Sequence, residues 1–400
     1  MPAELIDVET ARARVLAAVP GPPAAEPVLV PRALGRVLAS DVVAADDVPG
    51  FDNSAMDGFA VRAADTAAAP VVLPVAGEAR AGHPASDPLP AGAAIAISTG
   101  AVLPEGADAV VPVEDTAARD AAVEVRVAVR AGRHVRRAGE DVRAGDTVVG
   151  AGVRLGPAEL AVLASVGVAE ATCARRPRVA LLTTGDELVG PGEARGPGDV
   201  RDANAVGLAA LAVAVGAEVV HLARVPDEAE STVAALREAL GADAVVACGG
   251  VSVGTHDHVK PALAALGVEP AFWGVALRPG KPTWFGTRDG MLVFGLPGNP
   301  VSAMVTFHLF VRPALLALAG DAEPRALAEA ILDEPYAKAP GRAHAVRCTL
   351  EARSDGWHVR PTGPQGSHVL TSMLGARALA LLPAGRGDVA AGERVEIELL

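Results

Sequence analysis

The sequence predicts a multidomain protein in which a central α/β domain lies between β-rich regions. Between Arg178 and Cys248, strand-like apolar runs alternate with segments of helical periodicity, the pattern of a parallel sheet with helices on both faces. Before and after this region, short apolar runs are separated by Gly, Pro and Asp, which is typical of β structure. The length of 400 residues also exceeds what one hydrophobic core usually supports, so several domains are expected.

Composition limits the classes of partner. Apolar residues make up 50% of the chain but aromatic residues only 3%, so the core must depend on Val and Leu. The net charge is −13 with no stripe of Lys and Arg, which argues against nucleic acid as the main partner. No window approaches an uncharged membrane span, and the first residues lack the pattern of a signal peptide. We therefore expect neither a nucleic-acid nor a membrane partner.

The three cysteines indicate a reducing environment. Cys173, Cys248 and Cys348 lie far apart and form no CxxC or Cys/His cluster. Neither a disulfide framework nor a zinc site is predicted from such spacing. The simplest expectation is a cytoplasmic protein.

The elements follow in order along the chain. Residues 7–19 have helical spacing and end before Pro20, and residues 155–166 form a second predicted helix that begins at Gly156 and Pro157. Between these helices the pattern is that of short strands, predicted at residues 71–73, 94–97, 109–111 and 123–127.

The central region alternates strands with helices. Strands are predicted at residues 178–182, 218–222 and 244–248, and helices at residues 204–215, 228–240, 259–266 and 301–318. After residue 318 the sequence pattern is again typical of β structure, with strands predicted at residues 345–350 and 394–399. A small barrel or sandwich is therefore expected there. Ligands of such α/β sheets bind at the carboxyl ends of the strands.

Three glycine-centred loops lie beside strand-like runs, and they indicate an anionic ligand. We name them the glycine loop (residues 249–254), the cationic turn (residues 278–282) and the proline loop (residues 295–300). Exposed backbone N–H groups and helix starts favour phosphate or another oxyanion. Because the chain as a whole is acidic, this local chemistry predicts a small specific ligand.

The glycine loop follows a buried strand, so its backbone can turn sharply and approach a phosphate. Ser252 adds a hydroxyl donor. The loop is neither a Walker A motif nor a GxGxxG motif, and a simple turn is the alternative interpretation.

Acidic residues follow two strand ends. Asp257 is either a cap for the next helix or a Mg²⁺ ligand, because that ion often takes one or two carboxylates and phosphate oxygens. His256 and His258 flank it, but no further His or Cys lies near enough in sequence to favour zinc. Asp186 and Glu187 form a second acidic pair, for which capping and solvation are the alternative.

Cationic residues mark the cationic turn. Arg278 and Lys281 bracket a Pro-Gly pair, which holds two like charges at short range and thereby predicts an anion, although a plain solvated turn is possible. In the proline loop, Asn299 and Pro300 are typical of a helix start, with Ser302 in the first turn.

A polar and aromatic cluster at residues 51–61 stands out in a region with few aromatics. Its density of Asp, Asn and Ser suits a site for hydroxyls, amides or a metal, whereas the simpler interpretation is a turn-rich loop. Asp57, Thr99 and Asp141 are the candidates here, and each is weak alone.

Taken together and in this order, these segments resemble the MoeA/gephyrin family of molybdopterin molybdotransferases over nearly the whole chain. The most specific matches are residues 51–58, 183–188, 249–254 with Asp257, 279–282 and 295–302. The resemblance implies that adenylylated molybdopterin and molybdate give molybdenum cofactor and AMP, helped by Mg²⁺. It also implies contact with the adenylylating enzyme and with apo-molybdoenzymes.

The resemblance implies an elongated homodimer with four domains per chain, including a three-layer α/β molybdopterin-binding domain and a C-terminal β-barrel. The active cleft would lie between the α/β domain of one subunit and a β-domain of the other. The implied ranges are residues 1–50 with 137–175, 51–136, 176–322 and 323–400.

The resemblance also assigns roles to individual residues. Catalytic roles fall on Asp57, Thr99, Asp141, Glu187, Asp227, Asp257 and Lys281, of which Asp257, Glu187 and Asp227 would serve the metal. Molybdate would be held by Arg278, Lys281, Pro282, Arg347 and Ser367. Molybdopterin and nucleotide would be held by Thr184, Gly185, Asp186, Gly249, Gly250, Ser252, Gly254, Pro297, Gly298, Asn299 and Ser302.

Departures from the family pattern are modest. Arg278 stands where lysine is frequent, His258 replaces an aromatic residue, and the lone tyrosine, Tyr336, belongs to no motif. Two alternative functions stay open. The α/β region alone resembles the enzyme that adenylylates molybdopterin, and gephyrin-type relatives act as non-catalytic scaffolds, although this chain has neither a fused extra domain nor a disordered linker.

Overall fold

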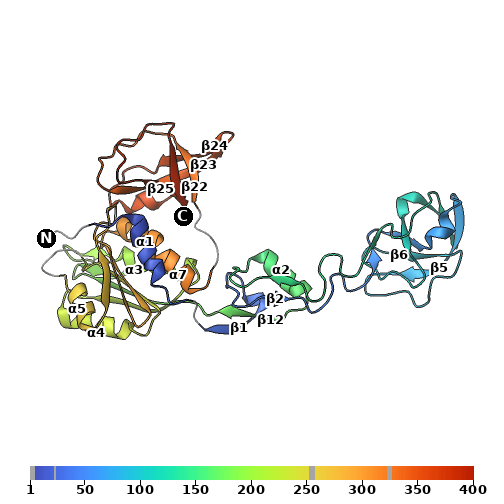
Figure 1. Cartoon of the computed structure of the whole chain (residues 1–400), viewed down its shortest axis with the longest axis horizontal. Coiled ribbons are helices and arrows are strands. Elements are labelled where there is room, and N and C mark those ends of the chain that lie inside the picture. Colours follow the sequence, from blue (N-terminus) through green and yellow to red (C-terminus); the bar gives the residue numbers. More distant parts are fainter. Residues whose placement is uncertain (1–4, 22–23, 252–256, 322–326) are drawn as a thin grey trace.

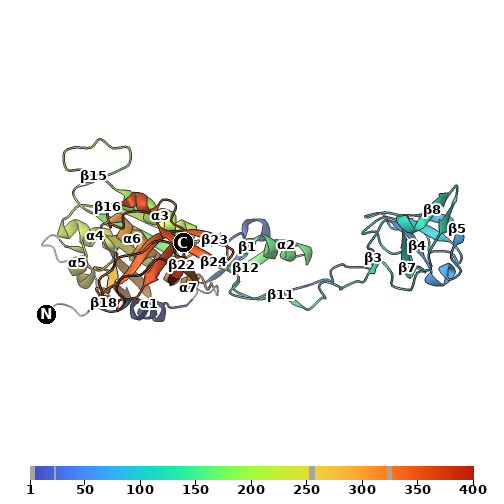
Figure 2. The ribbon, with the colours of Figure 1, turned by 90° about the horizontal axis from the view of Figure 1, so that it is seen from above.

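The protein is an elongated chain of separate domains (Figures 1 and 2). The computed structural model describes residues 5–21, 24–251, 257–321 and 327–400. An α/β domain and a β-barrel pack together at one end, a small linking domain lies in the middle, and a β-rich domain forms the far end. The predicted multidomain architecture is therefore confirmed.

Six strands form the central sheet in the spatial order β16-β13-β17-β21-β20-β18. They are β13 (Arg178–Thr184), β16 (Glu218–Val225), β17 (Ala244–Cys248), β18 (Glu269–Trp273), β20 (Trp284–Arg288) and β21 (Met291–Leu296). The first four strands in the spatial order are parallel, as predicted. β20 is antiparallel to both neighbours, because only Asp289 and Gly290 join it to β21 and both have positive φ.

Helices cover both faces of this sheet. They are α1 (Val8–Ala17), α3 (Ala203–Ala214), α6 (Pro300–Thr306) and α7 (Arg312–Leu318) on one face, and α4 (Ala229–Ala239) and α5 (Val259–Ala265) on the other. Neighbouring strand residues point to opposite faces, so Leu181 packs under the first group and Leu182 under the second. The predicted three-layer domain is confirmed.

The predicted single helix at residues 301–318 is confirmed as one helical stretch, Pro300–Leu318, but its middle is not α-helical. The segment η4 (Phe307–Val311) is π-helical and separates α6 from α7. Pro313 has no N–H to donate to the carbonyl of Leu309, and that carbonyl accepts a hydrogen bond from Arg12 Nε at 3.0 Å instead.

The same stretch comes nearer to a membrane span than the sequence prediction allowed. Pro300–Leu318 has 19 residues and a mean hydropathy of 1.7 in its most apolar window, of which 72% is buried inside the protein. A core helix packed between the sheet and the barrel has this composition.

The linking domain is built from segments on both sides of the far domain. It contains β1 (Ala25–Leu29) paired with β12 (Glu170–Ala174), β2 (Val42–Val43) paired with β11 (Thr147–Val149), and α2 (Pro157–Ser165). Leu38, Leu155 and Leu163 form its core. The chain between these paired segments runs out to the far domain and returns.

The far domain is a β-sheet in the order β7-β4-β6-β5-β9-β8. Its strands are β4 (Gly58–Val61), β5 (Val71–Ala79), β6 (Ala94–Ile97), β7 (Ala109–Pro112), β8 (Thr116–Arg119) and β9 (Ala122–Val125), and β3 (Asn53–Ser54) pairs with β10 (Val135–Arg136) at its base. Short 3₁₀ turns are η1 (Val30–Arg32), η2 (Ala63–Thr66), η3 (Val113–Asp115) and η5 (Leu370–Met373).

The C-terminal domain is a closed barrel of five strands, as predicted. β23, β24, β22, β26 and β25 follow one another around it, and β25 pairs with β23 to close it. Their bounds are β22 (Leu327–Leu332), β23 (Ala343–Arg353), β24 (Gly356–Pro361), β25 (Ala378–Leu382) and β26 (Arg394–Leu399). β19 (Leu277–Arg278), from the α/β domain, pairs with the start of β23. The residue boundaries predicted for the four domains stay predictions.

His358 of β24 lies between two carboxylates, and we infer that the stability of the barrel depends on its protonation. Asp333 hydrogen bonds to His358 Nδ1 at 2.7 Å and Asp355 to its Nε2 at 2.9 Å. The hydrogen bond with Asp333 raises the pKa of His358, and Asp355 adds to the effect. Desolvation opposes it, as does the charge of Arg353, whose Nη1 lies 2.9 Å from His358 Nδ1. Because the folded pKa is raised, this stabilisation is complete below the unfolded pKa of about 6.5 and is lost as the pH rises through the folded pKa.

We therefore expect His358→Gln to lower the thermal unfolding midpoint clearly near pH 6 and only slightly near pH 9, measured against the unchanged protein in the same buffers. His83→Gln, at an exposed histidine of the far domain, is the control and should shift neither midpoint. An equal loss for His358→Gln at both pH values would contradict the assigned titration.

Candidate functional site

The candidate site begins where three neighbouring parallel strands end. Thr183 of β13 pairs with Cys248 of β17, which in turn pairs with Leu296 of β21. The loops that follow these strands therefore leave the sheet at one edge. They are the loop at residues 184–187, the glycine loop and the proline loop.

Close backbone packing holds these loops together. Gly249 has a φ of +94°, and a Cβ there would lie 2.7 Å from Thr184 Oγ1 and 2.8 Å from the Thr184 carbonyl oxygen. A Cβ on Gly298 would lie 3.7 Å from the Gly249 Cα. Asn204, in the first turn of α3, donates from Nδ2 to the Gly298 carbonyl at 2.7 Å. The loop at residues 184–187, the described start of the glycine loop (residues 249–251) and the proline loop thus form one surface with α3.

Two polar atoms of this surface are buried without a hydrogen-bond partner among the described residues: Thr184 Oγ1 and Asn204 Oδ1. A buried polar atom without a partner is costly, so these atoms indicate a ligand or an adjoining chain segment. The Gly249 amide is not available to a ligand, because it donates to the Leu296 carbonyl at 3.1 Å. The expectation that the backbone amides of the glycine loop hold phosphate is thus wrong for this amide. Ser252 and Gly254 lie outside the described residues.

The proline loop contributes shape more than side chains. Pro297 is buried and its carbonyl accepts from the Cys248 thiol at 3.3 Å, while Ser302 is buried within α6. Asn299 is the N-cap residue of α6 as predicted, although its side chain makes no capping hydrogen bond. Ligand-binding roles for Pro297, Gly298, Asn299 and Ser302 stay predictions.

The acidic loops meet at the outer side of the same edge. Asp186 Oδ1 accepts from the Asp227 backbone N–H at 2.9 Å, and Gly185 N–H donates to Val225 O at 3.2 Å. Glu187 is exposed and its carboxylate folds over Gly185. Asp257 precedes α5, whose N-cap is His258, so the capping interpretation of Asp257 is not supported. Among the described residues, no three His, Cys, Asp or Glu side chains are grouped closely enough to hold a metal ion.

The cationic turn packs against α6. Its Gly280 has a φ of +124°, and a Cβ there would lie 2.5 Å from Thr306 Cγ2. Arg278 and Lys281 are exposed on either side of this contact, and Pro282 leads into β20. Close approach to α6 therefore requires glycine and leaves both cations free to face outward.

The barrel brings a third cation, Arg347, to the neighbourhood of α6. The Ser367 carbonyl accepts from the Val301 backbone N–H at 3.2 Å, which joins the barrel loop (residues 364–367) to the start of α6. Arg347 is 1% exposed and donates to Ser372 Oγ and to the carbonyls of Pro364 and Gly366. The two predicted molybdate segments therefore contact opposite ends of one short helix.

His344 and Tyr336 lie beside this site, and the sequence prediction missed both. His344 pairs with Arg278 across β19 and β23, and its Nδ1 lies 3.3 Å from the Tyr336 hydroxyl. Burial lowers the pKa of His344 to about 4, and the charges of Arg278, Lys338 and Arg342 act in the same direction. Tyr336 is also within electrostatic reach of Arg278 and Arg347. No sequence motif indicates either residue, because His344 reaches Arg278 only through the pairing of β19 with β23.

Three predicted site residues lie far from this edge within one chain. In the far domain, Asp57 Oδ1 accepts from the Thr99 backbone N–H at 2.7 Å and from its hydroxyl at 2.9 Å, and these bonds lower the pKa of Asp57. Asp141 is exposed in the segment that leads back from the far domain, where its N–H donates to the Val48 carbonyl. Asp57 and Thr99 are therefore joined to each other, and the far domain that contains them lies at the other end of the molecule from the α/β domain (Figure 1).

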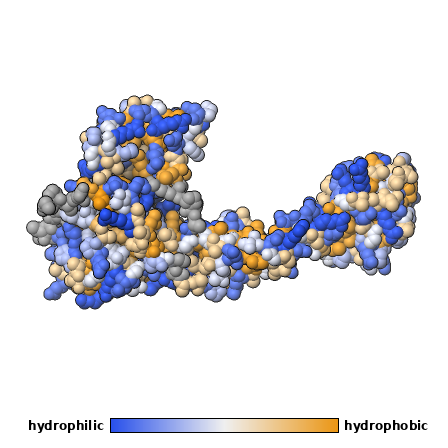
Figure 3. All heavy atoms as spheres, viewed as in Figure 1, coloured by the Kyte–Doolittle hydropathy of each residue, from blue (hydrophilic) through white to orange (hydrophobic). Residues whose placement is uncertain are grey.

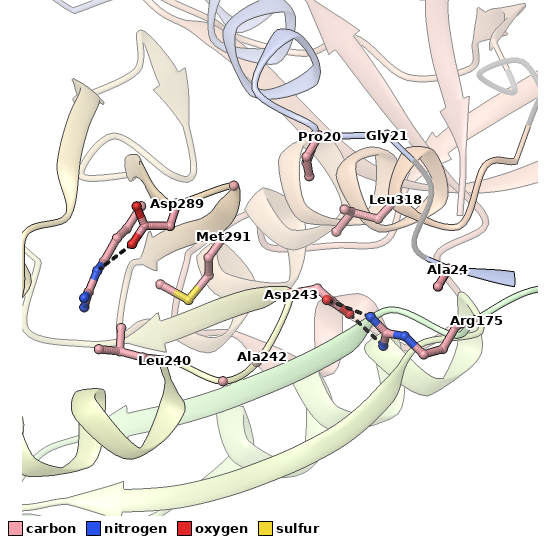
Figure 4. Close-up of a pocket in the computed structure, with 13 residues that line it drawn as sticks. Pro20, Gly21, Ala24, Arg175, Leu240, Ala242, Asp243, Asp289, Met291 and Leu318 are labelled. Carbon is pink, nitrogen blue, oxygen red and sulfur yellow. Dashed lines mark hydrogen bonds and ion pairs between the residues drawn. The ribbon is translucent and has the colours of Figure 1, made fainter.

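A separate cavity of about 470 Å³ lies at the opposite end of the sheet (Figure 4). Asp243, which precedes β17, and Met291, which begins β21, line it together with Pro20. The Asp243 carboxylate accepts two hydrogen bonds from the Arg175 guanidinium, at 2.9 and 3.1 Å. This cavity does not belong to the strand-end site.

Three known families match successive parts of the chain. Residues 6–167 match the family described as MoeA N-terminal region (domain I and II), and residues 180–317 match the one described as probable molybdopterin binding domain. Residues 329–400 match the family described as MoeA C-terminal region (domain IV).

Relatives match over almost the full length. A Haemophilus influenzae protein named molybdopterin molybdenumtransferase is 38% identical over 98% of this chain and 98% of its own. A Mycobacterium tuberculosis protein named molybdopterin molybdenumtransferase 2 is 40% identical over 94% and 95%. The crystal structure of a molybdopterin biosynthesis MoeA protein from Pyrococcus horikoshii OT3 has a TM-score of 0.86 at 30% identity, over 99% of this chain and all of that one.

The fold, the strand-end loops and these matches define a transferase of molybdenum cofactor biosynthesis. The chain belongs to the MoeA family, whose members include the molybdopterin molybdenumtransferases named above. The family resemblance predicted from the sequence motifs is confirmed.

We expect Gly249→Ala to disrupt the junction of the three loops, because the added Cβ would collide with Thr184. The strained φ and the collision together should cost about 1–3 kcal/mol or more in the free energy of unfolding. Gly267→Ala is the matched control, since Gly267 also has a positive φ but open space around its Cα. Chemical denaturation of both variants measures the difference. An equal loss for both would mean that the contact with Thr184 contributes nothing.

Proposed function

We propose that this protein transfers molybdenum from molybdate to adenylylated molybdopterin, with release of AMP. One arrangement carries the proposal: α6 contacts the cationic turn through Thr306 and the barrel loop through Val301. Cations from two domains thereby border the edge where the α/β loops end. An oxyanion site at these cations would therefore adjoin a site for a larger phosphorylated ligand at the strand-end loops.

The chemistry of the cations fits molybdate, which is a tetrahedral dianion. Arg278 and Lys281 are exposed on a stiff turn, and Arg347 is a buried guanidinium whose hydrogen bonds within the described chain go to neutral oxygen atoms. Burial lowers the pKa of Arg347, which expresses the cost of keeping this charge away from water. A bound dianion would offset that cost. Pro282 and Ser367 complete the proposed molybdate set.

The strand-end surface suits the molybdopterin nucleotide. Thr184 Oγ1 and Asn204 Oδ1 offer two polar atoms that lack partners among the described residues, and the close packing of Gly249 on Thr184 holds these atoms in place. Positioning the phosphate beside the oxyanion site would lower the entropy cost of their reaction. The transfer requires no covalent nucleophile from the protein.

A Mg²⁺ ion is part of the proposal. Asp227 and Glu187 lie in adjoining loops, linked by the contact of Asp186 with the Asp227 backbone, and Asp257 precedes α5. This donor set fits Mg²⁺, which needs only one or two protein carboxylates when phosphate oxygens and water supply the rest. The ion would neutralise charge on the leaving nucleotide.

We further propose that the working form is a homodimer in which the far domain of one subunit completes the cleft of the other. The separation of Asp57, Thr99 and Asp141 from the cleft of their own chain supports this. Apolar residues also reach the surface of the linking domain, among them Leu29, Leu34, Val43 and Val153 (Figure 3). The adenylylating enzyme and apo-molybdoenzymes are the proposed protein partners.

The cytoplasm is the proposed compartment, and the three unpaired, buried cysteines support it. Adenylylation of molybdopterin and a purely scaffolding role are less well supported. The matches to MoeA regions on both sides of the α/β domain, and relatives named as transferases over the full length, favour molybdenum transfer.

We expect Lys281→Ala to raise the molybdate concentration that gives half-maximal AMP release by about tenfold or more, because removing one of few point charges weakens dianion binding. The assay contains adenylylated molybdopterin, Mg²⁺ and increasing molybdate. Thermal unfolding should change little, since Lys281 is exposed.

Arg288→Ala is the control, because Arg288 is a cation at the other end of β20.

Mixed dimers test whether the two subunits share one site. At low molybdate concentration, Lys281→Ala and Asp57→Asn chains should each lose activity, and mixing the two chains should restore part of it. Unchanged molybdate dependence in Lys281→Ala would refute the oxyanion assignment, and a failure of mixing would refute the shared cleft.

A further inference from the structure

A buried ion network joins the barrel to the α/β domain behind the candidate oxyanion site. Glu398 of β26 is 2% exposed and receives hydrogen bonds from Arg12 Nη2 of α1 at 2.9 and 3.2 Å. His308 Nε2, from the π-helical segment η4, lies 3.3 Å from Glu398 Oε1 but makes no hydrogen bond within the described chain. Arg12 and His308 are each 5% exposed. Three segments distant in sequence therefore meet at one carboxylate.

The surroundings of this carboxylate are apolar. Leu379, which pairs with Glu398 across β25 and β26, belongs to the same hydrophobic cluster as Leu309 and Phe310. A carboxylate among such groups is costly unless it is paired and hydrogen bonded. Apolar packing alone tolerates small sliding, whereas a buried ion pair with directional bonds tolerates little. The network therefore favours one orientation of the barrel.

On the barrel side, the network is connected rigidly to Arg347. Glu398 pairs with Leu379, and Leu379 pairs with Arg347, so these residues form one row across three adjacent strands. The row spans two strand spacings, roughly 10 Å, and faces the α/β domain. Any rotation of the barrel about Glu398 would therefore move Arg347.

On the α/β side, the network is connected to the cationic turn. His308 follows two residues after Thr306, which packs against Gly280. Arg12 Nε also donates to the Leu309 carbonyl, the oxygen that Pro313 cannot satisfy, so Arg12 holds both the π-helical segment and Glu398. The same guanidinium thus fixes both sides of the interface.

We propose that Glu398 is a positioning residue for the oxyanion site, acting through Arg12. The network sets the separation of Arg347 from Arg278 and Lys281, and so determines how well a dianion is held between the two domains. This inference rests on the proposed function. It assigns no contact with substrate to Glu398.

Glu398→Gln tests the proposal, because it keeps the size of the side chain and removes the charge. We expect the half-saturating molybdate concentration to rise about tenfold or more, since small misplacement of binding groups is costly. The half-saturating concentration of adenylylated molybdopterin, held by the α/β loops, should change by less than about twofold. Glu396→Gln is the matched control: it lies on the same strand, is exposed, and should change neither value.

A distance measurement gives a readout independent of activity. Spin labels attached through Glu238→Cys in α4 and Glu334→Cys in the barrel report the separation of the two domains, and the three native cysteines are buried. The distance distribution should broaden or shift with Glu398→Gln and not with Glu396→Gln. An unchanged distribution would overturn the proposal, as would unchanged molybdate dependence or equal weakening of both substrates.

If Glu398→Gln folds poorly, the double variant Arg12→Met with Glu398→Met replaces the pair by apolar side chains, which proteins often tolerate. Weak molybdate binding in this folded variant supports positioning by the ion network, and binding like that of the unchanged protein overturns it. The Lys281→Ala experiment distinguishes a failure of the proposed function from a failure of the positioning role of Glu398. If Lys281→Ala has no effect on molybdate dependence, the proposed function fails. If only Glu398→Gln has none, the positioning role alone fails.

Discussion

The packing of the barrel against α6 and η4 is the constraint on which the candidate site depends. Val301 and Thr306 of one short helix contact the barrel loop and the cationic turn. On the far side of this interface, Glu398 of the barrel is held by hydrogen bonds from Arg12 of α1. Removing one member of a buried ion pair typically costs about 3–5 kcal/mol, so this interface has a strong preference for one geometry. The separation of the cations follows from that geometry.

The placement of the three cations also explains how a chain with a net negative charge could bind an anion. The chain carries a net charge of −13, which would repel a free dianion at long range. Arg278, Lys281 and Arg347 oppose this field only at the junction of two domains, where Arg347 is shielded from water. Specificity for a small oxyanion then arises from placement of few charges and not from a broad cationic surface. The proposed second subunit would enclose the same edge and reduce its contact with solvent.

Much of the fold was predictable because hydrophobic periodicity is local. The strand at Ala244–Cys248 and the helices α3 and α4 lie within a few residues of their predicted ranges. The π-helical segment was not predictable, because it depends on a carbonyl that Arg12, about 300 residues away in sequence, happens to satisfy. Likewise the motifs indicated Arg278, Lys281 and Arg347, whereas His344, Asn204 and Glu398 belong to no motif and acquire their places through tertiary contacts. The role of the Gly249 amide was also hidden, since its acceptor, Leu296, lies on another strand.

Locating the oxyanion directly is the sharpest test of the central claim. Tungstate has the same shape and charge as molybdate and scatters X-rays strongly, so crystals soaked in it report its position by anomalous diffraction. We predict a peak between the cationic turn and Arg347, beside α6, which weakens in crystals of the Lys281→Ala variant. A strong peak elsewhere, with none at this junction, would contradict the account.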